Sequence, residues 1–399
     1  MRALVRNPRS APPLPPPPGP LVRAIVSGAP GTHPPPPVES HHWNDELSIV
    51  VEANLAPAAL QLLREAPGRP DPLVLERLTS ATYEASVISL RVEAAAIVAL
   101  RQFRANAIPY VIVKGPAVGR YYSSALLRPY TDIDLVVAPS QVRLARRVAA
   151  SAKLYCPSSI EAPWPWFDRY CREGINLHGD NGANLDLHHH VPPWSFARQL
   201  TTEVLFDASE AGSLRGEPCR FASAQHCLVI ACLHLLNDLW KHSPALLSVR
   251  DIITLSKLLG PELTGKALTN ANLSWLTPLV AQRLSVFVDA SELGFGADVP
   301  LPLAISLRLS LLGWPRASRL SDHQFGWAGR LPVANAVAYL LGTAVPSRRY
   351  VRQRFGSYRQ YWRSGVRSLR QMVPEQSPGT PSSSSHPGRG PVDRSSTPS

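Results

Sequence analysis

The sequence IPYVIVKGPAVGRYYSSALLRPYTDIDLVV, residues 108–137, decides the fold of this chain. It opens with the β-branched run PYVIV, which predicts a short strand. Lys114-Gly115 ends that run, and Pro116 suits the first position of a helix, where its missing N–H is not needed. A second apolar run from Ile133 to Val137 predicts another strand. The stretch therefore predicts strand, sharp turn, short helix, loop and strand.

Two carboxylates lie at the start of the second predicted strand. Asp132 and Asp134 are two positions apart, so they share one face while Ile133 points into the core. Two like charges held this close repel each other unless a cation lies between them. Mg²⁺ takes oxygen ligands and is commonly held by one or two carboxylates together with substrate phosphates. The turn at Gly115 lets the backbone approach such phosphates, and the helix N-terminus behind it favours anions.

A β-hairpin is predicted from Gly174 to Val191. Its centre, Gly-Asp-Asn-Gly, is strong turn chemistry, and the residues on both sides alternate between apolar and polar. On the second predicted strand Asp186 and His188 face one way and the neighbouring leucines the other. A third carboxylate beside the first pair would complete a two-metal site, although a surface aspartate near a turn is the alternative. The consecutive histidines His188 to His190 alternate faces, so they cannot all bind one ion.

The residues KGPAVGRYYSSALLRPYTDIDLVV resemble the nucleotidyltransferase fold of the DNA polymerase β superfamily, in which a glycine-containing turn opens a helix before an Asp-x-Asp strand. More narrowly, they resemble the bacterial nucleotidyltransferase family still called uncharacterised. The resemblance is good over residues 108–137, weaker over roughly 71–260 and absent at both ends. The sequence departs from the superfamily at Gly115-Pro116. The superfamily has Gly-Ser or Gly-Gly there, so a serine contact to phosphate is absent.

This resemblance implies an α/β (α+β) fold, with a small mixed sheet of nucleotidyltransferase type flanked by helices and an additional C-terminal helical domain. It implies Asp132, Asp134 and Asp186 as catalytic metal ligands, because the family carries an Asp-Leu-His segment that matches Asp186-Leu187-His188. His188 is then a contact to the metal-bound carboxylates or to the nucleotide. The implied cofactor is Mg²⁺, two ions, or Mn²⁺ in their place.

Four further residues are candidates for binding the nucleotide beside Gly115. Lys114 either places a point charge on phosphate or pairs with Asp132 or Asp134, and Arg128 either holds a triphosphate or pairs with a nearby carboxylate. His234 and Lys241 lie on one polar stripe of a helix predicted from Ser223 to about Trp240. Such a stripe is usually solvated, but the resembling family has a similar helix, which implies contact with nucleotide or acceptor.

Composition divides the rest of the chain. Residues 1–40 hold 13 of the 41 prolines, so residues 1–42 are expected to be a disordered leader, and the Ser/Pro-rich residues 374–399 a disordered tail. Between them we expect a nucleotidyltransferase-like catalytic core with N-terminal helices at 43–222 and a helical domain at 223–373. Helices of that second domain are predicted at 278–293, 301–312 and 333–341.

The net charge of +12 is concentrated near the C-terminus, where residues 347–371 hold eight arginines and no acid. Aromatic residues interleave with Arg348 to Arg370, a composition that suits RNA, an anionic membrane surface or an ordinary solvated helix. No stretch of about 18 uninterrupted apolar residues predicts a transmembrane helix. The odd number of scattered cysteines argues against a disulfide framework and favours a cytoplasmic location.

Together these features predict a metal-dependent nucleotidyltransferase. It would move a nucleotidyl group from an NTP such as ATP to an acceptor hydroxyl, and pyrophosphate would leave. Protein, small metabolite, sugar and RNA all stay open as acceptors. The alternative is a non-catalytic nucleotide- or RNA-binding module that retains the fold.

Overall fold

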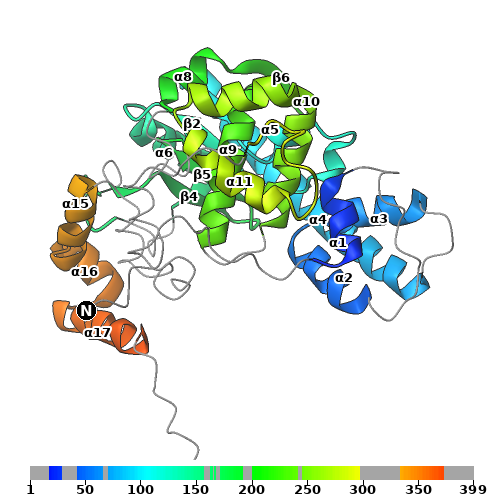
Figure 1. The fold of residues 1–399 in the computed structure, drawn as a ribbon. Coiled ribbons are helices and arrows are strands. Elements are labelled where there is room, and N and C mark those ends of the chain that lie inside the picture. The colour runs from blue at the N-terminus through cyan, green and yellow to red at the C-terminus, as the bar shows by residue number, and fades with distance from the viewer. Residues whose placement is uncertain are drawn as a thin grey trace, which may run out of the picture.

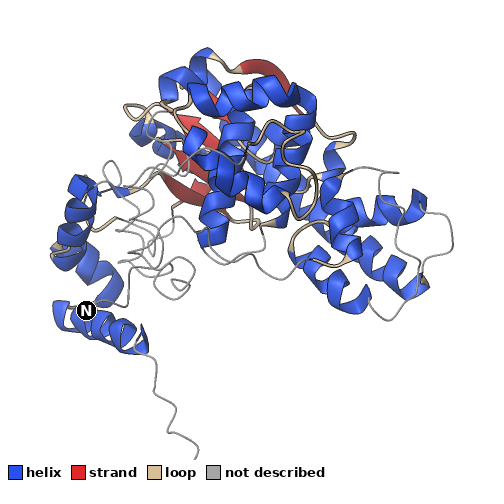
Figure 2. Cartoon of the chain, in the orientation of Figure 1, coloured by secondary structure: helices blue, strands red, loops and turns tan. Residues whose placement is uncertain are grey.

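The computed structural model shows a mixed sheet flanked by helices, which confirms the fold class expected from the sequence (Figures 1 and 2). The structure describes residues 18–28, 43–65, 71–156, 162–164, 166–167, 171–191, 200–240, 245–296 and 333–372. Within these residues the sheet has seven strands in the order β3-β4-β5-β2-β1-β7-β6. The strands are β1 (Tyr110–Ile112), β2 (Ile133–Val137), β3 (Leu154–Tyr155), β4 (Gly174–Gly179), β5 (Asn184–His188), β6 (Glu210–Leu214) and β7 (Glu217–Phe221).

The centre of the sheet sets the register of the candidate site. β2 runs antiparallel to β1, with Ile112 opposite Leu135, and parallel to β5. β1 also pairs in parallel with β7 through Ile112 and Phe221. The pairs β3–β4, β4–β5 and β6–β7 are antiparallel, and β4–β5 is the hairpin predicted from the sequence. Every residue of β1 and β2 is buried, as is typical of central strands that are covered on both faces.

Helices pack around this sheet, and the longest of those described is α4, with 34 residues. The Asp71 carboxylate accepts a hydrogen bond from the Leu73 N–H at 2.8 Å, and Pro72 takes the first helical position, so α4 begins there. The helices are α1 (Pro20–Ser27), α2 (Trp43–Glu52), α3 (Ala56–Glu65), α4 (Pro72–Ala105), α5 (Pro116–Gly119), α6 (Val142–Ser151), α8 (Thr202–Asp207), α9 (Ala224–Trp240), α10 (Leu246–Asn270), α11 (Thr277–Leu284), α15 (Val333–Ala344), α16 (Arg348–Phe355) and α17 (Tyr358–Met372).

One hydrophobic cluster runs through the sheet and the helices on both sides of it. Phe103 of α4, Ile112 of β1, Leu135 of β2 and Leu233 of α9 all belong to it, and each is fully buried. Helices α1 to α3 and helices α15 to α17 lie on opposite sides of the sheet-containing body in Figure 1. The division at residues 222 and 223 stays a prediction, because this core continues across it.

The expectation that residues 1–42 are disordered is wrong for Pro20–Ser27, which forms α1. The apolar run LVRAIV interrupts the prolines, and burial of Leu21 and Val22 favours an ordered helix here. Both helix ends are also held: the Val22 N–H donates to Glu46 Oε2 at 2.9 Å, and Lys257 Nζ donates to the Ser27 carbonyl at 2.9 Å. The described part of the leader is therefore part of the core.

The helix predicted at 278–293 is also shorter than expected, because α11 ends at Leu284. The Asp289 carboxylate accepts from the backbone N–H of Ser291 at 2.9 Å, a local turn that competes with continuation of the helix. The helix predicted at 333–341 is confirmed as α15, whereas 301–312 lies outside the described residues. None of the helices in the described ranges is long and apolar enough to cross a membrane.

Candidate active site

The parallel pairing of β2 and β5 brings two of the predicted carboxylates side by side. Asp134 of β2 lies opposite Asp186 of β5, and Ile133 lies opposite Leu185. The predicted placement of the hairpin beside the Asp-x-Asp strand is therefore confirmed. Because side chains alternate along each strand, Asp134 and Asp186 share one face and the leucines pack on the other. Asp132 lies two residues before Asp134, just outside β2, and is partly exposed.

Three possible ligand groups form a compact set at this point. One carboxylate oxygen each of Asp134 and Asp186 and one ring nitrogen of His188 lie within 4.8 Å of one another. His188 follows Asp186 by two residues on β5, so strand alternation brings its ring to the same face. Asp132 is not a member of this set, although its charge is close enough to affect the pKa of Asp186. The described site is thus two carboxylates and an imidazole, with a third carboxylate at its edge.

Asp134 is the anchored carboxylate of the site. Its Oδ1 atom lies 2.8 Å from Lys114 Nζ and 2.9 Å from His188 Nε2. Burial by itself raises the pKa of Asp134, but the Lys114 ammonium and the His188 ring outweigh that effect, so this pKa lies below its usual value. Lys114 thus takes the second of its two predicted roles, pairing with a site carboxylate, and its side chain is 24% exposed. Since solvent still reaches it, the predicted phosphate contact stays open.

The other two carboxylates, Asp132 and Asp186, lie where ionisation is unfavourable. Burial and the charge of Asp134 raise the pKa of Asp186 to about 6. The same two causes, in the same order, raise the pKa of Asp132. Both shifts mean that the ionised forms are disfavoured, although Lys114 and His188 balance part of the negative charge and Arg128 acts in the same direction on Asp132. A divalent cation would reverse this sign, because it favours ionised carboxylates.

The turn at Gly115 has a conformation that requires glycine. Gly115 has φ 50° and ψ −111°, and a Cβ atom there would lie 3.2 Å from Cγ of Tyr130. The tight turn places Lys114 beside Asp134. Helix α5, which follows, is a single turn of four residues. The anion-favouring helix N-terminus expected from the sequence is therefore weak, because the effect sums over aligned peptide dipoles.

Arg128 lies in a buried ion pair. Its Nη2 atom is 2.7 Å from Oδ2 of Asp251, near the start of α10, and Asp251 Oδ1 accepts from the Tyr122 hydroxyl at 2.6 Å. Arg128 and Asp251 are 8% and 3% exposed. The alternative of a nearby carboxylate partner is thus what the structure shows, although the pair is buried and not on the surface. Contact with a triphosphate stays a prediction for Arg128. From the sequence, Arg250-Asp251 was expected to open this helix, which begins at Leu246, and no role was predicted for Asp251.

The remaining predicted contacts are placed less directly. His188 is 5% exposed and its Nε2 atom lies 2.9 Å from Oδ1 of Asp134, whereas its predicted contact with a nucleotide stays a prediction. His234 lies on α9, and the compact ligand set formed by described residues does not include it. Lys241 lies outside the described residues. The nucleotide-binding roles of His234 and Lys241 stay predictions.

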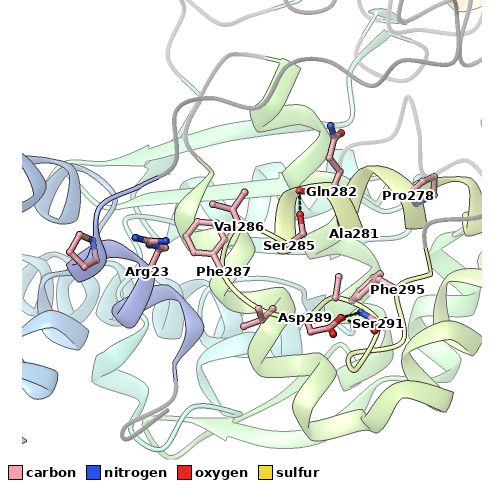
Figure 3. A pocket seen from close by; sticks show the side chains of 13 residues that line it. Arg23, Pro278, Ala281, Gln282, Ser285, Val286, Phe287, Asp289, Ser291 and Phe295 are labelled. Carbon is pink, nitrogen blue, oxygen red and sulfur yellow. Dashed lines mark hydrogen bonds between the residues drawn. The ribbon is translucent and has the colours of Figure 1, made fainter. Parts of the chain in front are cut away.

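A cavity of about 1050 Å³ lies elsewhere, between α1 and α11 (Figure 3). Arg23 comes from α1, while Gln282, Asp289 and Phe295 come from α11 and the segment after it. Its lining does not include the three aspartates, and it lacks their crowded charge. The carboxylates on β2 and β5, not the volume of this cavity, therefore define the candidate site.

A mixed sheet that pairs an Asp-x-Asp strand with a third carboxylate defines a site of nucleotidyltransferase type. The chain belongs to the uncharacterised nucleotidyltransferase family, whose model matches residues 39–281. Among solved structures, the chain is similar to an antigenic nucleotidyltransferase-like protein from Paracoccidioides brasiliensis, with 18% identity and a TM-score of 0.30 over 49% of this chain and 94% of that one. A search of curated proteins gave no match.

Proposed function

We propose that this protein transfers a nucleotidyl group from an NTP, with ATP as the first candidate, to an acceptor hydroxyl. The observation that carries the proposal is the register of β2 and β5, which places Asp134 beside Asp186. Membership of a nucleotidyltransferase family supports the reaction class. Transfer of this kind needs positioning and charge neutralisation more than covalent chemistry, and crowded carboxylates beside a lysine suit both tasks.

The residues present fit a divalent metal. The donor atoms are mostly carboxylate oxygens, the type that Mg²⁺ and Mn²⁺ prefer. Burial and then the charge of Asp134 raise the pKa of Asp186, and a divalent cation bound among these groups would favour its ionised form. When bound, two Mg²⁺ ions would neutralise phosphate charge and lower the pKa of the acceptor hydroxyl. Asp132, Asp134 and Asp186 are the proposed ligands.

Each residue then has a proposed task. Asp132 and Asp134 would hold metal on the triphosphate side, and Asp186 would hold metal on the acceptor side. His188 keeps the Asp134 carboxylate in one orientation through the bond between Nε2 and Oδ1. Lys114 is the proposed phosphate contact, because its ammonium already lies at the carboxylates and is partly exposed. The turn at Gly115 sets the position of the Lys114 ammonium beside Asp134.

One observation favours the alternative, a non-catalytic nucleotide- or RNA-binding module. Lys114 and His188 both bond to Asp134 Oδ1, so two protein groups already balance the most buried carboxylate. In such a module Lys114 would stand in for a cation, and nucleotide would bind without divalent metal and without turnover. Metal dependence therefore separates the two functions. We further propose the cytoplasm as the location, supported by the odd number of scattered cysteines in the sequence, which argues against a disulfide framework.

The test combines titration and transfer. Mg²⁺–ATP is titrated calorimetrically into the full chain, and each labelled NTP is incubated with protein, Mg²⁺ and a host extract. Asp134→Asn should abolish metal-dependent nucleotide binding, and Asp186→Asn should spare much of the binding but abolish transfer. Asp180→Asn is the matched control, because Asp180 is an exposed aspartate in the turn of the same hairpin. If both site variants bind as the wild type does, the carboxylates do not form a metal site.

A further inference from the structure

The helix α15 carries an exposed apolar stripe. Its residues Val333, Val337, Leu340 and Leu341 are 82%, 50%, 39% and 60% exposed, and Val345, just after the helix, is 63% exposed. These positions follow the spacing i, i+4, i+7, i+8 and i+12, which places them along one side of a helix. The sequence of α15 contains no charged residue. Scattered apolar residues on a surface are ordinary, but a continuous stripe marks a surface for interaction.

The two helices that follow are strongly basic. Residues 347–371 contain eight arginines and no acid. Arg348, Arg349, Arg352, Arg359 and Arg363 are all exposed. Two aromatic side chains of α17 lie among them, Tyr358 at 40% exposed and Trp362 at 51%. The exposed aromatic side chains of α17 therefore lie within a positively charged surface, and the apolar stripe of α15 precedes it in the chain.

Specific contacts hold these helices together and to the rest of the chain. The Tyr361 hydroxyl of α17 donates to the Thr343 carbonyl of α15, and the Tyr358 hydroxyl donates to the Pro346 carbonyl. Trp164 Nε1 donates to the Val345 carbonyl at 2.7 Å, so the segment before the catalytic hairpin contacts the end of α15. The apolar stripe and the arginines therefore belong to one structural unit.

We propose that α15, α16 and α17 form a peripheral membrane-binding surface that recognises anionic lipid headgroups. Arginines pair with the headgroups, while exposed valines, leucines and Trp362 enter the boundary with the acyl chains. The aliphatic stripe decides between membrane and RNA: aromatic groups and arginines suit either, but valine and leucine do not stack on bases. The charge of this unit is complementary to an anionic leaflet and would be repelled by a cationic one.

The experiment measures co-sedimentation of the full chain with vesicles made of equal parts phosphatidylcholine and phosphatidylserine, compared with phosphatidylcholine alone. The double variant Arg359→Gln/Arg363→Gln should lower the partition coefficient by about thirtyfold, at roughly fivefold for each arginine near an anionic surface. Its matched control is Arg143→Gln/Arg147→Gln, which removes two exposed arginines from α6 and should leave binding unchanged. High salt should weaken binding of the wild type.

A second pair of variants tests the apolar contribution. Val337→Asn/Leu341→Asn should weaken vesicle binding at low and at high salt, because burial of apolar groups is not screened. Leu73→Asn/Leu258→Asn is the control, since both leucines are exposed on other helices, at 68% and 55%. Equal binding to both kinds of vesicle, or no binding to either, would overturn the proposal. So would binding of a single-stranded RNA that depends on Arg359 and Arg363 without any vesicle binding.

Discussion

Replacing Asp251 with alanine should destabilise the folded state by about 4 kcal/mol, because it leaves the buried Arg128 without its carboxylate partner. The side chains of Arg128 and Asp251 are only 9% and 5% exposed, and they bond at 2.7 Å. Loss of one partner from a buried pair costs about 3–5 kcal/mol, most of it from the uncompensated charge that remains. The Tyr122 hydroxyl loses its acceptor as well, but the two losses share one carboxylate and do not add fully.

The assay is urea and thermal unfolding of wild type and variant. At a slope of about 2–4 °C for each kcal/mol, Tm should fall by roughly 8–16 °C. Glu262→Ala is the control, on the part of α10 that follows the kink at Gly260, because Glu262 pairs with Lys266 at 2.5 Å but the two side chains are 78% and 60% exposed. An exposed pair of this kind contributes little, so the control should unfold within error of the wild type.

A double variant distinguishes the cost of removing the whole ion pair from the cost of leaving one buried charge without a partner. Arg128→Met/Asp251→Leu removes both charges and keeps similar volume, so it should recover much of the stability that Asp251→Ala loses. The Tyr122 hydroxyl stays without an acceptor in both, so recovery should be incomplete. If Asp251→Ala is no less stable than Glu262→Ala, or if the double variant is less stable than the single one, the pair does not hold this region as the structure indicates.

Three shorter predictions address other parts of the chain. Leu21→Ala should cost about 2–5 kcal/mol in urea unfolding, whereas a disordered leader would show no change. Gly115→Ala should cost about 1–3 kcal/mol, since alanine at a positive φ is strained, and retained stability would refute the assigned turn. Burial raises the pKa of Cys227 to about 12, so iodoacetamide at pH 8 should leave it unlabelled in the native protein and label it after unfolding.

The site carboxylates were predictable because strand patterns are local. The spacing of Asp132 and Asp134 and the alternation around Asp186 both follow from a period of two, which needs no tertiary information. The Gly-Asp-Asn-Gly turn fixed the hairpin for the same reason. That the hairpin lies beside the Ile133–Val137 strand was expected only with the help of the family resemblance, and the parallel register that puts Asp134 opposite Asp186 was not predicted. Local propensity does not determine which strands pair when distant segments form a sheet.

Two elements show where local reasoning failed. Helix α1 is short and lies between proline-rich stretches, so the overall composition predicted disorder despite the apolar run. A helix this short is stable only when it packs on the core. The hairpin of β6 and β7 was not predicted at all, although Arg215 and Gly216 form a turn with both φ angles positive. Its first strand, Glu-Ala-Gly-Ser-Leu, has low strand propensity, so pairing with β7 decides its conformation.

The cations of the site show a further limit of sequence reasoning. Lys114 was open between phosphate and carboxylate, and the structure shows that the turn at Gly115 puts its ammonium on Asp134. His188 reaches the same oxygen from β5, so one buried carboxylate is bonded by one group from the turn after β1 and one from β5. Both groups stabilise the ionised form of Asp134, which in turn raises the pKa of Asp186. The proton-binding properties of the site therefore belong to the network and not to any one residue. A pattern that identifies each ligand separately cannot supply them, since they depend on distances between strands.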